Sequence, residues 1–229
     1  MRSVLEQNST GAELPFKFVG GDVSLDLINT VDWTEDGPVH ERITDYRRFV
    51  EWAKGAGIIS VSDEKSLLRL AKSHPEAAAK AYAKVIELRS FLQRLFRSVA
   101  DGQRSEILFE EFNKRLVDVL SRLRIAPAKG RGGGGKVADW SWSGFDEHLD
   151  SVLWQVIRSA AELLTSDESA RIRSCDGPDC GWMYVDRSRN HLRRWCEMET
   201  CGTAAKTRRR RERTRRVTRR ATGAAKRSR

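Results

Sequence analysis

Four cysteines are the residues of this chain whose type and spacing point most directly to chemistry. They are all of its cysteines and lie close together, at Cys175, Cys180, Cys196 and Cys201. Four residues separate the members of each short pair, and fifteen separate the pairs. Four thiolates so arranged can surround one metal ion tetrahedrally and leave no position for water or substrate. The pattern predicts a structural Zn²⁺ site.

Two other uses of the same thiols stay open at this stage. A cysteine-ligated iron–sulfur cluster could serve as a redox sensor, and the thiols could also be unligated. Disulfides are disfavoured because we expect a reducing compartment, where clustered cysteines usually bind metal. His191 could replace one cysteine as a ligand, but the set is complete without it and we expect His191 on the surface.

A strongly basic segment follows the last cysteine. Residues 206–229 contain 13 basic residues and one acidic residue, whereas residues 1–170 carry a net charge of −3. Arginine outnumbers lysine eleven to two, and its planar guanidinium bonds phosphate oxygens in pairs. We expect this arm to be disordered alone and partly helical on a polyanion. The predicted phosphate contacts are Lys206, Arg208, Arg209, Arg210, Arg211 and Arg213.

The residues between the cysteine pairs predict a strand at 181–185 and then a helix capped by Asp186 or Ser188. We expect Leu192 and Trp195 to face inward on this helix. Its exposed side would present Arg189, Asn190, Arg193 and Arg194, which could read base edges in the major groove. The alternative is that these four residues touch only phosphates.

The body before residue 170 predicts a mainly α (α+β) fold, a helical N-terminal domain with a small β element. Apolar periodicity predicts helices at 46–53, capped by Thr44 or Asp45; at 67–71, capped by Ser62 or Asp63; and at 75–99, 105–123 and 145–164. Residues 14–32 predict a strand and a turn followed by a strand or helix, and residues 137–142 alternate like a strand. The glycine-rich segment 130–136 is expected to be a flexible loop, without the features of a nucleotide-binding loop.

These patterns divide the chain into three parts. We expect a helical domain at 1–170, a zinc finger at 171–205 and a nucleic-acid-binding arm at 206–229. The first ten residues contain no apolar segment, and no run of 18 apolar residues occurs. The sequence therefore predicts a cytoplasmic, nucleoid-associated protein without membrane contact.

Residues 180–202, CGWMYVDRSRNHLRRWCEMETCG, with the basic run after them, resemble the CGNR-type zinc fingers of bacterial transcription regulators. The family pattern ends in Cys-Gly-Asn-Arg, but here Thr203 and Ala204 follow Cys201-Gly202. Lys206 matches the lysine that commonly follows. If that Asn-Arg pair contacts DNA or braces the finger in relatives, the resemblance implies that Arg193, Arg194 and the arm take over that role here.

The segment FKFVGGDVSLDLINT, residues 16–30, looks like the start of the ABATE domain that precedes such fingers. The resemblance implies a stress-induced transcription regulator whose N-terminal domain senses a small-molecule effector. Gly20, Gly21, Asn29 and Thr30 carry the match and are the candidate ligand-binding residues. The alternative is that they form a turn and a helix cap.

Together, these observations predict a DNA-binding transcription regulator whose body senses a ligand or forms a homodimer. The alternative is an RNA-binding or ribosome-associated zinc protein, in which Trp182 and Tyr184 could stack on bases if exposed. We do not expect an enzyme, because the chain has no catalytic signature. Its candidate carboxylates, which we expect to be solvated, are Asp22, Asp26, Asp32, Glu35 and Asp36.

Overall fold

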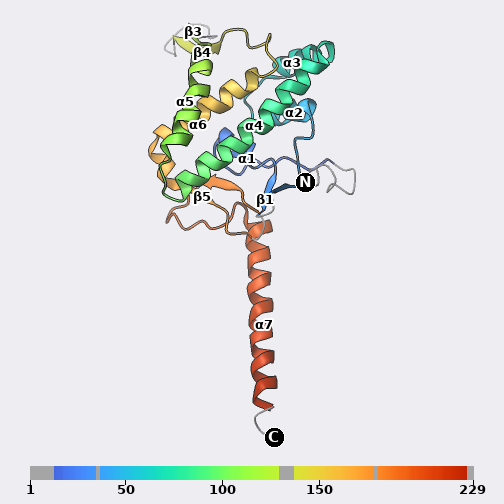
Figure 1. Cartoon of the computed structure of the whole chain (residues 1–229), viewed down its shortest axis with the longest axis vertical. Coiled ribbons are helices and arrows are strands. Elements are labelled where there is room, and N and C mark those ends of the chain that lie inside the picture. The colour runs from blue at the N-terminus through green and yellow to red at the C-terminus, as the bar shows by residue number, and fades with distance from the viewer. Residues whose placement is uncertain (1–12, 35–36, 129–136, 178–179, 226–229) are drawn as a thin grey trace.

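The computed structural model describes residues 13–34, 37–128, 137–177 and 180–225, with only the backbone for 215–225. Helices dominate, and three two-stranded antiparallel sheets accompany them (Figure 1). The predicted mainly α fold class is thus confirmed. The helices are α1 (Val23–Ile28), α2 (Tyr46–Gly55), α3 (Val61–Ser73), α4 (Pro75–Ala100), α5 (Glu106–Leu120), α6 (Ser151–Thr165) and α7 (Thr203–Ala225). The strands are β1 (Asp32–Thr34), β2 (Gly37–Val39), β3 (Leu123–Pro127), β4 (Ala138–Trp142), β5 (Ile172–Ser174) and β6 (Met183–Val185).

Helix α4 is the centre of the body. It begins with a proline at its first position, where a missing backbone N–H costs nothing, and ends just before Gly102 at φ 75°. Its buried face includes Val85, Leu92 and Phe96, all fully buried. Helices α1, α2 and α3 pack against α4, and α6 packs against α1 and α5. The prediction for this helix is confirmed.

Helix caps account for the start of two neighbouring helices. The Asp45 side chain accepts a hydrogen bond from the Arg48 N–H and begins α2, as predicted. Helix α3 begins earlier than expected, because Ser60 is its cap and Asp63 bonds back to the Ser60 N–H. This reciprocal pair is a capping box, so the predicted cap at Ser62 or Asp63 was wrong by a few residues.

The predicted end of α5 was wrong. The helix ends at Leu120, and residues 123–127 instead form β3, which pairs with β4 so that Ile125 lies opposite Trp140. Ile125 in β3 and the two tryptophans of β4, Trp140 and Trp142, favour this ladder. Helix α6 starts at Ser151, so Phe145 and Leu149 precede it. The glycine-rich segment 130–136 lies outside the described residues.

A buried ion pair joins α4 to the segment after β2. Arg89 is 2% exposed and Glu41 is 6% exposed, and Arg89 Nη1 donates to Glu41 Oε1 at 2.7 Å. The same nitrogen donates to Thr30 Oγ1 at 2.9 Å, and Glu41 Oε1 also accepts from the Ile43 N–H. Because these contacts meet in the core, they fix the position of Thr30 in the loop after α1.

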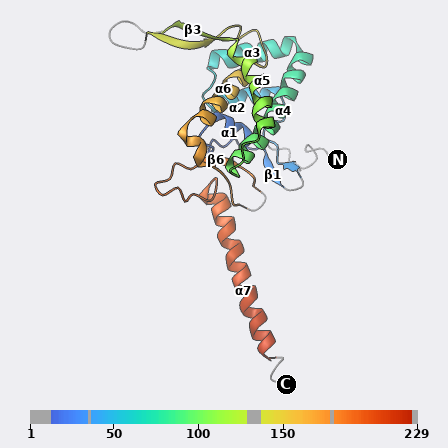
Figure 2. The ribbon, with the colours of Figure 1, turned by 60° about the vertical axis from the view of Figure 1, so that its left-hand side comes forward.

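Helix α7 extends away from the rest of the molecule and carries the chain to its C-terminal end (Figures 1 and 2). The expectation of a disordered arm is therefore corrected: the backbone is helical from Thr203 to Ala225. Ala, Arg and Lys make up most of α7 and are good helix formers, and this helix propensity outweighs the charge repulsion that predicted disorder. None of the described helices is long and apolar enough to span a membrane.

Candidate metal centre and nucleic-acid interface

The four cysteine sulfurs converge on one point. All four Sγ atoms lie within 4.8 Å of one another, and the Cys180–Cys196 and Cys196–Cys201 sulfur distances are 3.6 Å. A tetrahedral site with Zn–S bonds of about 2.3 Å has sulfur–sulfur edges of about 3.8 Å. The arrangement therefore fits zinc. His191 is exposed, and its Nδ1 lies 3.1 Å from the Asp186 carbonyl oxygen, as expected for a surface residue.

Backbone groups around the cluster stabilise negative sulfur. The N–H groups of Gly177 and Cys196 donate to Cys175 Sγ at 3.3 and 3.2 Å. Glycine is required at 177, because an added Cβ would lie 2.8 Å from both Cβ and Sγ of Cys201. Part of the turn between the first two cysteines, 178–179, lies outside the described residues.

The thiols of the metal-free cluster cannot all ionise together. Hydrogen bonds from the Cys180 and Cys196 thiols lower the pKa of Cys175 to about 2. Sharing that thiolate raises the pKa values of Cys180 and Cys196, and burial raises the pKa of Cys201. A divalent cation removes this conflict because it neutralises several thiolates at once.

The cysteine module is packed onto the helical body. Strands β5 and β6 pair with Ile172 opposite Val185, and both side chains belong to the main hydrophobic core together with Met183. Gly181 has φ 61°, and an added Cβ would lie 2.4 Å from the Cβ of Trp33. Strands β5 and β6 therefore extend the body's core, the cysteines form a second cluster with Trp182 and Tyr184, and a close backbone approach between the two parts requires glycine.

The four candidate ligand-binding residues are at this junction. The Asn29 amide donates to the Met183 carbonyl and accepts from the Met183 N–H, each at 2.8 Å. The Gly20 carbonyl accepts from the Val185 N–H at 2.8 Å, while Thr30 bonds to Leu27 and Arg89. Asn29 and Thr30 are 1% and 2% exposed. Their polar groups are thus bonded within the chain, which favours the structural alternative over ligand contact.

Further contacts at the same junction were not foreseen from the sequence. Trp182 Nε1 donates to the Val31 carbonyl at 3.0 Å, and the Trp33 N–H donates to the Cys180 carbonyl at 3.1 Å. Lys17 forms an ion pair with Glu197. No local pattern signals these contacts, because their partners are separated by most of the chain.

The predicted reading helix at 188–195 does not form. Residues 186–197 adopt turns and irregular structure, and Leu192, expected to face inward, is 75% exposed. The Asp186 carboxylate accepts from the backbone N–H groups of Ser188 and Arg193 at 2.9 and 3.0 Å. Burial opposes its charge, but these hydrogen bonds outweigh burial and lower the pKa of Asp186. The carboxylate thereby stabilises a loop where a helix was expected.

The four predicted base-reading residues are divided between two environments. Arg193 lies with its guanidinium 4.0 Å from the Tyr184 ring and donates to the carbonyls of Val19, Trp195 and Cys196, so it braces the module. Arg194 is half exposed and pairs with Asp176 at 2.7 Å. Arg189 and Asn190 are exposed. Of the four residues, only Arg189, Asn190 and part of Arg194 face solvent as predicted.

The metal centre holds the base of α7. Cys201 lies in a short π-helical turn, Met198–Gly202, directly before the first residue of α7. Gly202 and Ala205 are buried against the module. All the predicted phosphate-contacting side chains of the arm are exposed: Lys206, Arg208, Arg209, Arg210, Arg211 and Arg213.

The carboxylates considered for catalysis have structural partners. Asp22 caps α1 through the Ser24 N–H, Asp26 accepts from the Gly20 N–H at 2.8 Å, and Asp32 pairs with Arg42 at 3.0 Å. Burial raises the pKa of Asp26 to about 6. Glu35 and Asp36 lie outside the described residues.

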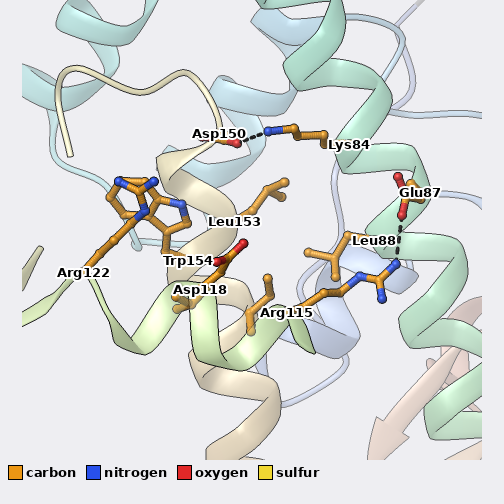
Figure 3. A pocket seen from close by; sticks show the side chains of 11 residues that line it. Lys84, Glu87, Leu88, Arg115, Asp118, Arg122, Asp150, Leu153 and Trp154 are labelled. Carbon is orange, nitrogen blue, oxygen red and sulfur yellow. Dashed lines mark hydrogen bonds and ion pairs between the residues drawn. The ribbon is translucent and has the colours of Figure 1, made fainter. Parts of the chain in front are cut away.

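A groove in the body lies between α4, α5 and α6 (Figure 3). Its volume is about 320 Å³ and its floor includes Leu88 and Leu153. Ion pairs cross it at two places, Lys84 with Asp150 and Arg115 with Glu87. Since three cations and three anions line the groove, it has no preference for one sign of charge.

Comparison with known families assigns both parts of the chain. Residues 171–214 match the CGNR zinc finger. Residues 21–167 match the ABATE family, described as "putative stress-induced transcription regulator". A search of curated proteins finds no match. With the sulfur geometry, the finger match identifies the four cysteines as ligands of a structural zinc ion.

Proposed function

Because the chain belongs to the ABATE family and carries a CGNR zinc finger, we propose that it is a DNA-binding transcription regulator that binds through α7. The observation that carries the proposal is a basic helix fixed at its base by a zinc ligand. Helix α7 contains ten basic residues and one acidic residue, Glu212. Such a field attracts a polyanion.

The dimensions of α7 suit duplex DNA. Its 23 residues correspond to about 35 Å at about 1.5 Å per residue, close to one turn of B-DNA. The major groove is about 12 Å wide and admits an α-helix. Arginines on several faces of α7 would contact phosphates on both sides of the groove, and such contacts give affinity without sequence choice.

Zinc supplies the stability that sets the direction of α7. Structural zinc contributes about 10–16 kcal/mol in finger peptides, and this module shares only part of the body's core. Cys201 is a ligand two residues before Thr203, the first residue of α7, so the metal restrains the first turn of α7. We infer that Arg189 and Asn190, exposed on the same module, supply base or phosphate contacts beside the helix.

Salt titration of DNA affinity tests the electrostatic part. Contact with about six phosphates predicts a log–log slope of about −5 between affinity and salt concentration. Arg209→Gln should reduce that slope by about one unit. Arg69→Gln, which removes an exposed arginine of α3, is the matched control and should leave the slope unchanged. A slope near zero for the natural chain contradicts the proposal.

Selection of bound sequences from fragmented genomic DNA tests regulation itself. Recovery of one motif, lost in Arg189→Ala, supports a specific regulator, whereas length-dependent binding alone contradicts it. Stronger binding to structured RNA would favour the RNA-binding alternative. That alternative loses its expected stacking residues, because Trp182 and Tyr184 are 4% and 0% exposed.

The remaining parts of the proposal concern the body and the location of the protein. We propose that the helical domain responds to a small-molecule effector or forms a homodimer, and a homodimer would double the contact with DNA. Sedimentation velocity tests the dimer. A cytoplasmic, nucleoid-associated location accompanies a DNA-binding role, and fluorescence imaging of a tagged chain with stained DNA tests it.

A further inference from the structure

A second pocket lies where the helical body meets the zinc module. Its volume is about 430 Å³. One wall comes from the α4–α5 turn, with Gly102, Gln103 and Arg104. The other comes from Ser169, before β5, and from Arg173 in β5. The pocket therefore joins the body to the strand that continues directly to Cys175.

The charges of this pocket have one sign. Arg104 and Arg173 line it, and no carboxylate does. Neither arginine forms an ion pair within the part of the chain that the structure describes. The nearby acids are already used, since Asp101 pairs with Arg97 at 3.3 Å and Glu168 with Arg187 at 2.6 Å. The groove of Figure 3 differs, because its cations are matched by anions.

The two arginines differ in how firmly their side chains are held. Arg173 donates from Nη1 to the carbonyls of Ala170 and Ile172 at 2.9 and 2.8 Å, which holds its guanidinium in place. Arg104 is exposed on the opposite wall. One fixed and one movable guanidinium can bind the two oxygens of a carboxylate, as guanidinium forks commonly do.

The rest of the lining is apolar. Val99, Phe109 and Leu164 are half-buried, so part of their surface remains for a ligand to cover. A bare inorganic anion or a DNA phosphate would leave this surface uncovered. An aromatic or aliphatic group beside the carboxylate would cover this apolar surface, and removing it from water favours binding.

We propose that this pocket binds a small organic carboxylate with an apolar body, held by Arg104 and Arg173 over Phe109 and Leu164. Binding would link the α4–α5 turn to β5, and hence to the module that carries α7. That this carboxylate acts as an effector of DNA binding rests on the proposed function. The binding site itself does not rest on that function, because carboxylate binding is measured without DNA.

Calorimetric titration of the zinc-loaded full chain with benzoate tests the site. Benzamide and benzylamine have the same ring with a neutral and a cationic group, and neither should bind. Arg104→Gln should weaken benzoate binding about tenfold or more, the usual effect of losing a charge-assisted hydrogen bond. Arg69→Gln, an exposed arginine on α3, should bind benzoate like the natural chain.

Three results would overturn the inference. The first is the absence of a benzoate signal, and the second is equal binding of benzoate and benzamide. The third is an Arg104→Gln chain that binds DNA more weakly but benzoate normally, which would assign Arg104 to DNA phosphates. Failure of the proposed function is a separate result, since the chain would then bind benzoate but not DNA.

Discussion

Asn29 offers the sharpest test of how the zinc module is held, because one side chain makes two hydrogen bonds to the backbone of Met183. Asn29→Ala removes both and leaves a buried N–H and a buried carbonyl without these partners. Each unsatisfied buried group costs about 1–3 kcal/mol, so the free energy of unfolding of the docked module should fall by about 2–6 kcal/mol. Asn29→Asp should also destabilise, because a carboxylate oxygen would face the Met183 carbonyl.

The assay follows two signals during urea unfolding: far-ultraviolet circular dichroism for the helices, and a chromogenic chelator for released zinc. In the natural chain, the two transitions should coincide because the module and body share a core. In Asn29→Ala, zinc release should move to lower urea, ahead of the helical transition. Asn113→Ala, exposed on α5, is the control. A shift of less than about 0.5 kcal/mol in Asn29→Ala would refute the reasoning.

Four further outcomes are expected. Burial raises the pKa of Asp26 to about 6, so the folded chain loses stability as pH rises from about 4, where the unfolded chain ionises, to about 6. Asp26→Asn should therefore increase the free energy of unfolding by up to about 3 kcal/mol at pH 7.5 and by much less at pH 4.5. The melting temperature at the two pH values measures this difference. An equal gain at both values would contradict this reasoning. Gly177→Ala places a Cβ 2.8 Å from Cys201 Sγ, so competition with a chelator should show weaker zinc affinity. Gly57→Ala, at an open turn, should leave zinc affinity unchanged. Arg89→Met leaves Glu41 buried without its guanidinium and should cost about 3–5 kcal/mol in denaturant unfolding, and an unchanged midpoint would count against the ion pair. Zinc removal should abolish DNA binding, and adding zinc back should restore it. Equal binding by the metal-free chain would mean that the arm binds DNA without the folded finger.

What the sequence could predict depended on how local the cause was. The spacing of the four cysteines predicts a four-thiolate metal site, although zinc was distinguished from an iron–sulfur cluster only by the family match, and α4 follows from apolar periodicity between Pro75 and Gly102. The helix expected at 188–195 was wrong because hydrogen bonds from Ser188 and Arg193 to the Asp186 carboxylate stabilise a loop. The role of Asn29 depends on a residue 154 positions away. No short-range pattern indicates such a partner, although resemblance had marked the residue as important.

The attachment of α7 at its base has a mechanical consequence. A helix of about 35 Å fixed at one end acts as a lever, and a rotation of about 10° at Gly202 moves its far end by about 6 Å. One base pair of B-DNA rises about 3.4 Å, so that displacement covers nearly two base pairs. In the proposed DNA complex, small changes in how β5 and β6 pack on the body would therefore change which base pairs lie next to the end of the helix.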